Sequence, residues 1–160
     1  MQKSLVSFLV LVIVIASGIA DSASLSDASP EAAHDQAIEL ARNGAFEEAL
    51  AILYDLRAEA PEDLSLLYDE TVILSWAGDD GRALTNAELI DVDAAPDYVL
   101  ETVGKAARNA GRYDVAIRWY EALYRRAPDN LDARLGLAFS HADAGKRGAR
   151  ITAPLPADAR

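Results

Sequence analysis

Residues 109–116 read Asn-Ala-Gly-Arg-Tyr-Asp-Val-Ala, and much of this arrangement returns elsewhere in the chain. Glycine readily adopts the left-handed backbone with which a helix often ends, so Gly111 predicts a turn after a helix. After it, apolar residues recur at the spacing of one helix face, at Ala116, Ile117, Tyr120 and Leu123. We therefore predict two helices joined at Gly111.

The turn glycine belongs to a set of landmarks with a period of 33 or 34 residues. The set comprises the glycines Gly44, Gly78, Gly111 and Gly145, the alanines Ala49, Ala83 and Ala116, and the prolines Pro61, Pro96 and Pro128. A small residue five positions after the turn lets two helices approach closely. Proline suits the break after the second helix or the start of the next one. The period predicts a repeated helical hairpin.

Seven helices follow from these landmarks. We place them at residues 30–43, 46–59, 64–77, 80–93, 97–110, 113–127 and 130–144. The third unit resembles the tetratricopeptide repeat (TPR) family at Gly104, Gly111, Tyr113, Ala116, Tyr120 and Pro128. The resemblance implies an all-α TPR solenoid of about three and a half repeats, over 30–63, 64–96, 97–130 and an incomplete 131–145. The second unit has one extra residue before Pro96, and Leu56, Ile90 and Leu123 stand where the family usually has a small residue.

A narrower resemblance covers residues 33–145. The segments 76–80 (Trp-Ala-Gly-Asp-Asp), 110–114 (Ala-Gly-Arg-Tyr-Asp) and 132–145 resemble the periplasmic TPR region of the outer-membrane porins that export poly-β-1,6-N-acetylglucosamine. In that family this region engages a periplasmic polysaccharide deacetylase and guides the partly deacetylated polymer. The resemblance implies the same class of partners here.

The first twenty residues have the layout of a secretory signal peptide. Lys3 precedes an apolar run from Leu5 to Ile15, and small residues follow up to Ala20. We expect cleavage near Gly18-Ile19-Ala20, the alternative being an uncleaved anchor, and a flexible linker over 21–29. The domain is thus expected in the periplasm, with no membrane span after cleavage, and associated with the outer membrane if it belongs to a longer porin. With no cysteine, it must be held by packing alone.

The repeat pattern stops after Gly145. Residues 146–160 are basic and contain Pro154 and Pro156, so we expect an irregular or disordered tail. The helix at 130–144 would then lack a partner to cover its apolar residues, among them Leu135 and Phe139. We interpret the chain as a truncated or frameshifted piece of a longer repeat protein, the alternative being a short natural protein with an atypical end.

Composition and motifs argue against catalysis. The formal net charge of −11 disfavours nucleic acid and favours cationic partners, although acidity also serves solubility. His34 and His141 lie three repeats apart, and no nucleophile or phosphate-loop motif is present, so we expect no metal site, no cofactor and no enzyme activity. Paired acids such as Glu47-Glu48 fall at helix starts, where carboxylates favour the helix dipole.

The first helix of each TPR hairpin lines the concave groove, so we expect ligand contacts there. The candidates from register are Tyr68, Asp69, Val72, Trp76, Tyr98, Glu101, Lys105, Arg108, Asn109, Asp132 and Phe139. Trp76 and Tyr98 suit stacking on sugar rings or anchoring a peptide, but Trp76 equally suits the core. Lys105, Arg108 and Asn109 suit a carboxylate, the alternative being a solvated face with Glu101 paired to Lys105.

Three functions remain open from the sequence. The first is a periplasmic scaffold of polysaccharide export that binds a deacetylase, a cationic polysaccharide or both. The second is a generic envelope TPR factor that binds peptides. The third is a fragment that does not fold stably and has no function.

Overall fold

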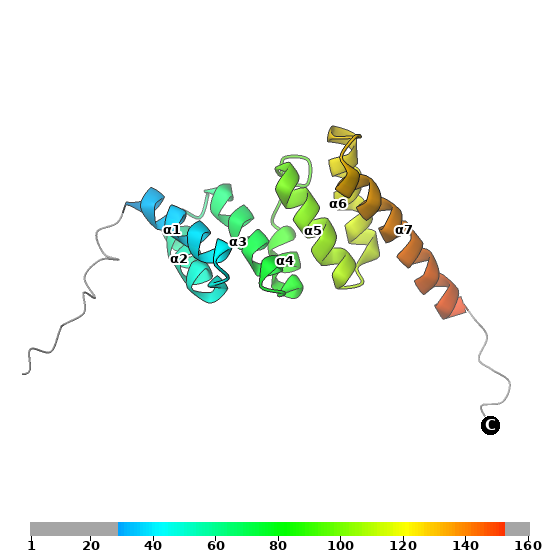
Figure 1. The fold of residues 1–160 in the computed structure, drawn as a ribbon, viewed down its shortest axis with the longest axis horizontal. Helices are drawn as coiled ribbons and strands as arrows, with labels where there is room; N and C mark the ends of the chain where they lie inside the picture. The colour runs from blue at the N-terminus through cyan, green and yellow to red at the C-terminus, as the bar shows by residue number, and fades with distance from the viewer. Residues whose placement is uncertain (1–28, 153–160) are drawn as a thin grey trace, which may run out of the picture.

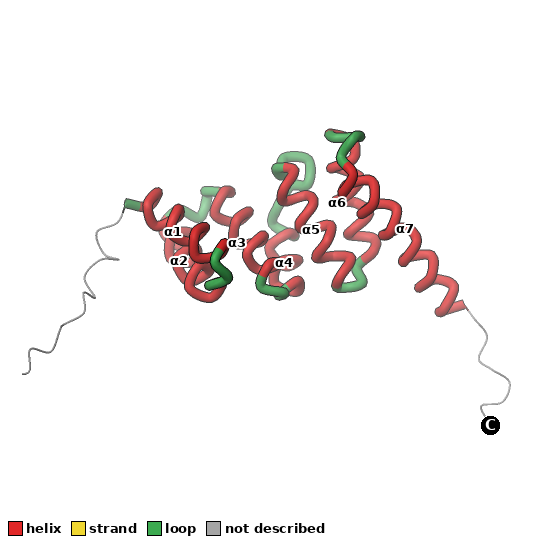
Figure 2. Tube along the Cα trace, viewed as in Figure 1, coloured by secondary structure: helices red, strands yellow, loops and turns green. Residues whose placement is uncertain are grey.

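The structure is a computed structural model and describes residues 29–152. This part of the chain is all helical and contains no strand (Figures 1 and 2). The helices are α1 (Pro30–Arg42), α2 (Phe46–Glu59), α3 (Leu64–Trp76), α4 (Asp80–Ala87), α5 (Asp97–Asn109), α6 (Tyr113–Arg126) and α7 (Leu131–Thr152). The expected signal peptide and nearly all of the linker lie outside the described residues.

Three tight turns reverse the chain where the sequence predicts them. Gly44, Gly78 and Gly111 have φ angles of 83°, 82° and 70°, which only glycine adopts without strain. Side-chain caps begin several helices: Ser29 Oγ accepts the Ala32 amide at 3.2 Å, and Asp79 accepts the Arg82 amide at 3.0 Å. The local sequence therefore specifies where these hairpins begin and bend.

The hairpins α1/α2, α3/α4 and α5/α6 lie in a row that α7 closes (Figure 1). Helix α3 contacts α5, and α5 contacts α7, so these three helices lie side by side. The alanines Ala49, Ala83 and Ala116 are fully buried, as expected for residues at which two helices approach closely. A single core of Leu, Val, Ile and Ala residues runs through the row.

Helix α4 ends at Ala87, so the prediction that it reaches residue 93 is wrong. Ile90 and Val92 are both buried, although residues two apart point to different sides of a helix. The segment 88–96 instead forms turns, one of which is closed by Asp91, whose carboxylate accepts the Asp93 amide at 3.0 Å. Figure 2 shows this longer connection between α4 and α5.

Helix α7 continues through Gly145 to Thr152, so the predicted turn there and the irregular structure of 146–152 are also wrong. After each of the other turn glycines, the chain contains apolar residues whose burial stabilises a second helix packed against the first. After Gly145 the chain offers Lys146 and Arg147 instead, and the helix simply extends. Arg147 donates a hydrogen bond of 2.7 Å to the Gly111 carbonyl, which fastens α7 to the α5–α6 turn. The remainder of the expected tail, 153–160, lies outside the described residues.

Candidate binding groove

Three helices are joined by side chains on their groove face. His34 of α1 lies 2.8 Å from one carboxylate oxygen of Asp69 on α3, and the hydroxyl of Tyr98 on α5 donates to the other at 3.3 Å. Burial raises the pKa of Tyr98 to about 12, and the charge of Asp69 and its hydrogen bond add to the shift. The phenol therefore remains a donor at neutral pH. Asp69 and Tyr98, both predicted from the sequence, here connect helices.

A hollow between α3 and α5 brings together four of the predicted residues. We call it the α3–α5 hollow; it measures about 360 Å³ and is lined by Ser75, Trp76, Glu101, Thr102, Lys105 and Asn109. Trp76 is 52% exposed, so the alternative that it fills the core is wrong, and its side chain lines the hollow. No ion pair joins Glu101 to Lys105 in the described structure, which leaves both charges facing the hollow.

The groove continues from α5 to α7. The guanidinium of Arg108 lies 5.4 Å from the centre of the Phe139 ring, within the range of a cation–π contact. Phe139 is 51% exposed, and Leu135, one turn earlier, is also exposed. Arg108 is thus engaged with an aromatic face, and only Lys105 and Asn109 of the proposed carboxylate-binding trio line the hollow.

Three predicted residues lie elsewhere. Val72 is buried in the core and cannot line the groove, so its assignment is wrong. Tyr68 is half-buried and packs against the core. Asp132 is exposed at the start of α7 and lies outside the hollow.

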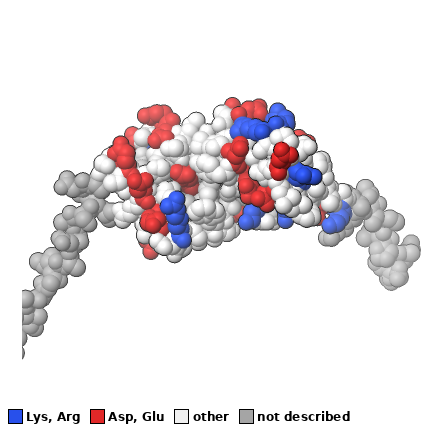
Figure 3. Space-filling view, turned by 45° about the horizontal axis from the view of Figure 1, so that its top comes forward, with Lys and Arg blue, Asp and Glu red and all other residues white. Residues whose placement is uncertain are grey.

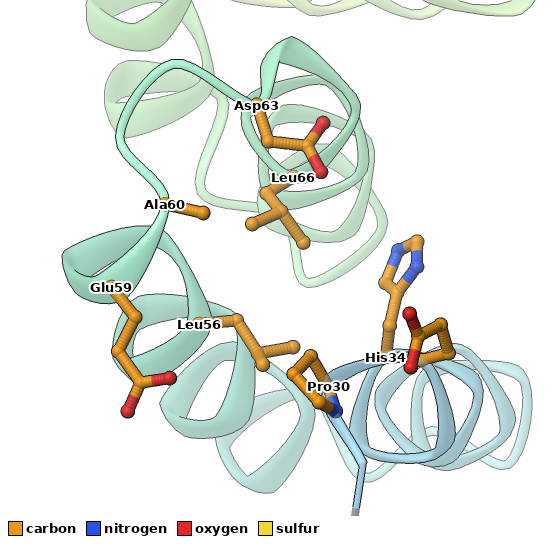
Figure 4. A pocket seen from close by; sticks show the side chains of 8 residues that line it. Pro30, His34, Leu56, Glu59, Ala60, Asp63 and Leu66 are labelled. Atoms are coloured by element: carbon orange, nitrogen blue, oxygen red, sulfur yellow. The ribbon is translucent and has the colours of Figure 1, made fainter.

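A second pocket lies where α1, α2 and α3 meet, at residues that were not among the predicted ligand contacts (Figure 4). This α1–α3 pocket measures about 350 Å³. Figure 4 shows Leu56, Leu66 and Ala60 directed into the space, with His34 on the opposite side. Glu31, Glu59 and Asp63 supply carboxylates to the same lining. The apolar floor and acidic rim suit a cation with a carbon skeleton.

Two of these carboxylates are held in the charged form. Backbone and Ser29 hydrogen bonds lower the pKa of Glu31, and hydrogen bonds from the Ser65 hydroxyl and amide lower the pKa of Asp63. The sequence carried one hint of the pocket. Ile90 and Leu123, one and two hairpins further along, stand at the same place after the turn glycine as Leu56 and are buried, whereas Leu56 is only half-buried.

Basic residues are scarce over the first two hairpins. Between residues 29 and 96 the only ones are Arg42, Arg57 and Arg82, and all three form ion pairs, with Glu39, Glu70 and Asp79. Figure 3 shows acidic side chains over this part of the row, with basic ones gathered toward the C-terminal part. The first half of the molecule therefore presents an excess of negative charge that is not neutralised internally.

Residues 29–147 contain no group of three His, Cys, Asp or Glu side chains arranged to hold a metal ion. Among the helices of the described region, none combines the length and apolar character needed to cross a bilayer. Comparison with protein-family models, with curated proteins and with solved structures finds no match for this chain.

Proposed function

We propose that this chain is a non-catalytic TPR scaffold of the cell envelope that binds a partly deacetylated, cationic β-1,6-linked glucosamine polymer during its export. The regular spacing of the turn glycines and of the buried alanines supports the TPR assignment. The residues resembling the export porins support the choice of polymer.

The main observation in favour of a cationic ligand is the negative charge of the first two hairpins. Free amines of a deacetylated glucosamine are protonated at neutral pH, and an acidic surface with few cations of its own attracts them. The acidic rim of the α1–α3 pocket offers a place for one such amine. Trp76 in the α3–α5 hollow offers an exposed aromatic face for a sugar ring.

Binding of defined oligomers tests this function. Calorimetry at low salt should detect binding of partly deacetylated β-1,6-glucosamine oligomers, weaker binding in added salt, and little binding of the fully acetylated ones. Trp76→Ala should weaken binding about fivefold or more, whereas Tyr124→Ala, which removes an exposed aromatic of α6, should not. Equal affinity for acetylated and deacetylated oligomers would exclude charge as the basis of recognition.

The charge can be tested separately. Glu59→Gln removes a carboxylate from the α1–α3 pocket, and Glu121→Gln removes an exposed one from α6 as the matched control. We expect only the first variant to lose affinity for the deacetylated oligomer.

Binding of a protein partner, such as the periplasmic deacetylase, can be tested by pull-down from envelope extracts.

The alternative is a generic envelope factor that binds peptides. The exposed residues Leu131, Leu135 and Phe139, spaced four apart on α7, favour it because apolar side chains of a peptide can pack there. Recovery of peptide-tailed partners together with no glycan binding would select this function.

Export itself can be tested by fusing residues 1–30 to a reporter that is active only outside the cytoplasm.

A further inference from the structure

The early end of α4 leaves an opening between α4 and α6. We call it the α4–α6 cavity; it measures about 230 Å³, and its apolar walls come from Leu84, Ile90, Val115 and Trp119. It lies among the second helices of the hairpins and shares no lining residue with the α3–α5 hollow or the α1–α3 pocket. Its function is therefore separable from that of the groove.

Two arginines border this cavity: Arg112, directly before α6, and Arg118 within α6. Arg112 and Arg118 are exposed, and no described acidic side chain lies within ion-pairing distance of either. Neither guanidinium donates a hydrogen bond to another described residue. Glu88 is the single carboxylate in the lining. In a chain of net charge −11, two cations that have no partner among the described residues and border one cavity create a local site for an anion.

The size of the cavity limits the anion. At roughly 30 Å³ for each water-sized unit, the space holds about eight such units, below the roughly 300 Å³ typical of sites that enclose a whole small-molecule ligand. One amino-acid residue with an apolar side chain fits, and the remainder of a longer ligand must lie outside. A terminal residue of a chain satisfies both conditions. Guanidinium groups match the planar carboxylate at a C-terminus.

We propose that the α4–α6 cavity binds the C-terminal residue of a partner polypeptide, with its carboxylate on Arg112 and Arg118 and its apolar side chain against Trp119. The site requires an apolar last residue and a free carboxylate. It does not depend on what the groove binds.

Tryptophan fluorescence of the full chain tests the proposal. The chain has two tryptophans, so Trp76→Phe leaves Trp119 in the cavity wall as the only reporter. The probe is the pentapeptide Gly-Ser-Gly-Ser-Leu with a free carboxylate, which should shift the Trp119 emission saturably. The same peptide with an amidated C-terminus should bind at least tenfold more weakly. Equal binding of the two peptides, or no binding of the free acid, overturns the proposal.

Variants locate the site. Arg112→Gln and Arg118→Gln should each weaken binding about tenfold, whereas Arg134→Gln, which removes an exposed arginine of α7, should not. Glu88→Gln removes the carboxylate of the cavity lining and should strengthen binding, a result that loss of folding cannot imitate. Unchanged affinity in the arginine variants overturns the proposal. If free 4-methylpentanoate binds as tightly as the peptide, the site belongs to small carboxylates and the assignment to a polypeptide end is wrong.

Discussion

The ring of Tyr120 fills the space next to Gly136 where any other residue would place its Cβ atom. The same ring lies against Gly104 of α5, where an added Cβ would stand 2.9 Å from it. Tyr120 is 4% exposed, and burial raises its pKa. One aromatic side chain of α6 therefore packs against two neighbouring helices, α5 and α7, and both accommodate it with a glycine.

Gly136→Ala should destabilise the protein for this reason. The new methyl group would overlap the Tyr120 ring, and overpacking of this kind costs about 1–3 kcal/mol, more than the gain of up to about 1 kcal/mol from replacing a helical glycine. Chemical denaturation followed by circular dichroism measures the difference. Gly145→Ala is the matched control on the same helix: its Cβ would meet nothing within 4 Å, so the variant should be as stable as the parent or more so. Stabilisation by Gly136→Ala would show that Tyr120 can move aside.

Glu70→Ala should be costly because the carboxylate is buried and shared. Glu70 of α3 is 3% exposed, accepts a hydrogen bond from Arg57 of α2, and accepts another from the Asn86 amide of α4 at 2.8 Å. Its removal leaves two donors without an acceptor, and we expect a loss of about 2–4 kcal/mol. Glu39→Ala breaks an ion pair of which both members are 67% exposed and should cost less than about 0.5 kcal/mol. Similar losses in the two variants would contradict this difference.

The hairpins could be predicted because their signals are local. Each turn is specified by a glycine with a positive φ and by an alanine five residues later, where two helices approach closely. This pair of residues occurs at all three turns, which begin at Gly44, Gly78 and Gly111. The same signal failed at Gly145, since a turn needs an apolar segment behind it. The end of α4 could not be predicted because the segment after it is held by a residue distant in sequence, Arg126, which donates hydrogen bonds to the Val92 and Ala95 carbonyls.

The candidate groove was predicted in part for the same reason. Helical register places Trp76 and Lys105 on one face, and they do line one hollow. Register does not say which side chains will pair across helices. The contact of His34 with Asp69, 35 residues later, and that of Arg108 with Phe139 depend on how neighbouring hairpins are spaced.

Arg126→Ala should loosen the connection between α4 and α5. The guanidinium of Arg126, at the end of α6, donates to the backbone carbonyls of Val92, Asp93 and Ala95 and so replaces the hydrogen bonds that a longer α4 would have made. We expect a loss of about 1–3 kcal/mol and faster hydrogen exchange in residues 88–96. The neighbouring Arg125 pairs only with the exposed Asp93 carboxylate, so Arg125→Ala should have little effect on either measurement.

Tyr98 predicts how stability changes at high pH. Its pKa is about 12 in the folded chain, against about 10 for an unfolded tyrosine, so the folded state retains the phenolic proton more strongly. The stabilisation from this proton is fully present below pH 10 and is lost as the pH rises from 10 to 12. Because Tyr98 is 47% exposed, solvent screening reduces the contribution to about 1 kcal/mol. Between pH 10 and 12 the unfolding free energy of Tyr98→Phe should therefore decline less steeply than that of the parent protein. In an ultraviolet titration, the variant should lack the tyrosine ionisation near pH 12. Parallel declines in the two proteins would mean that Asp69 and burial do not hold this proton.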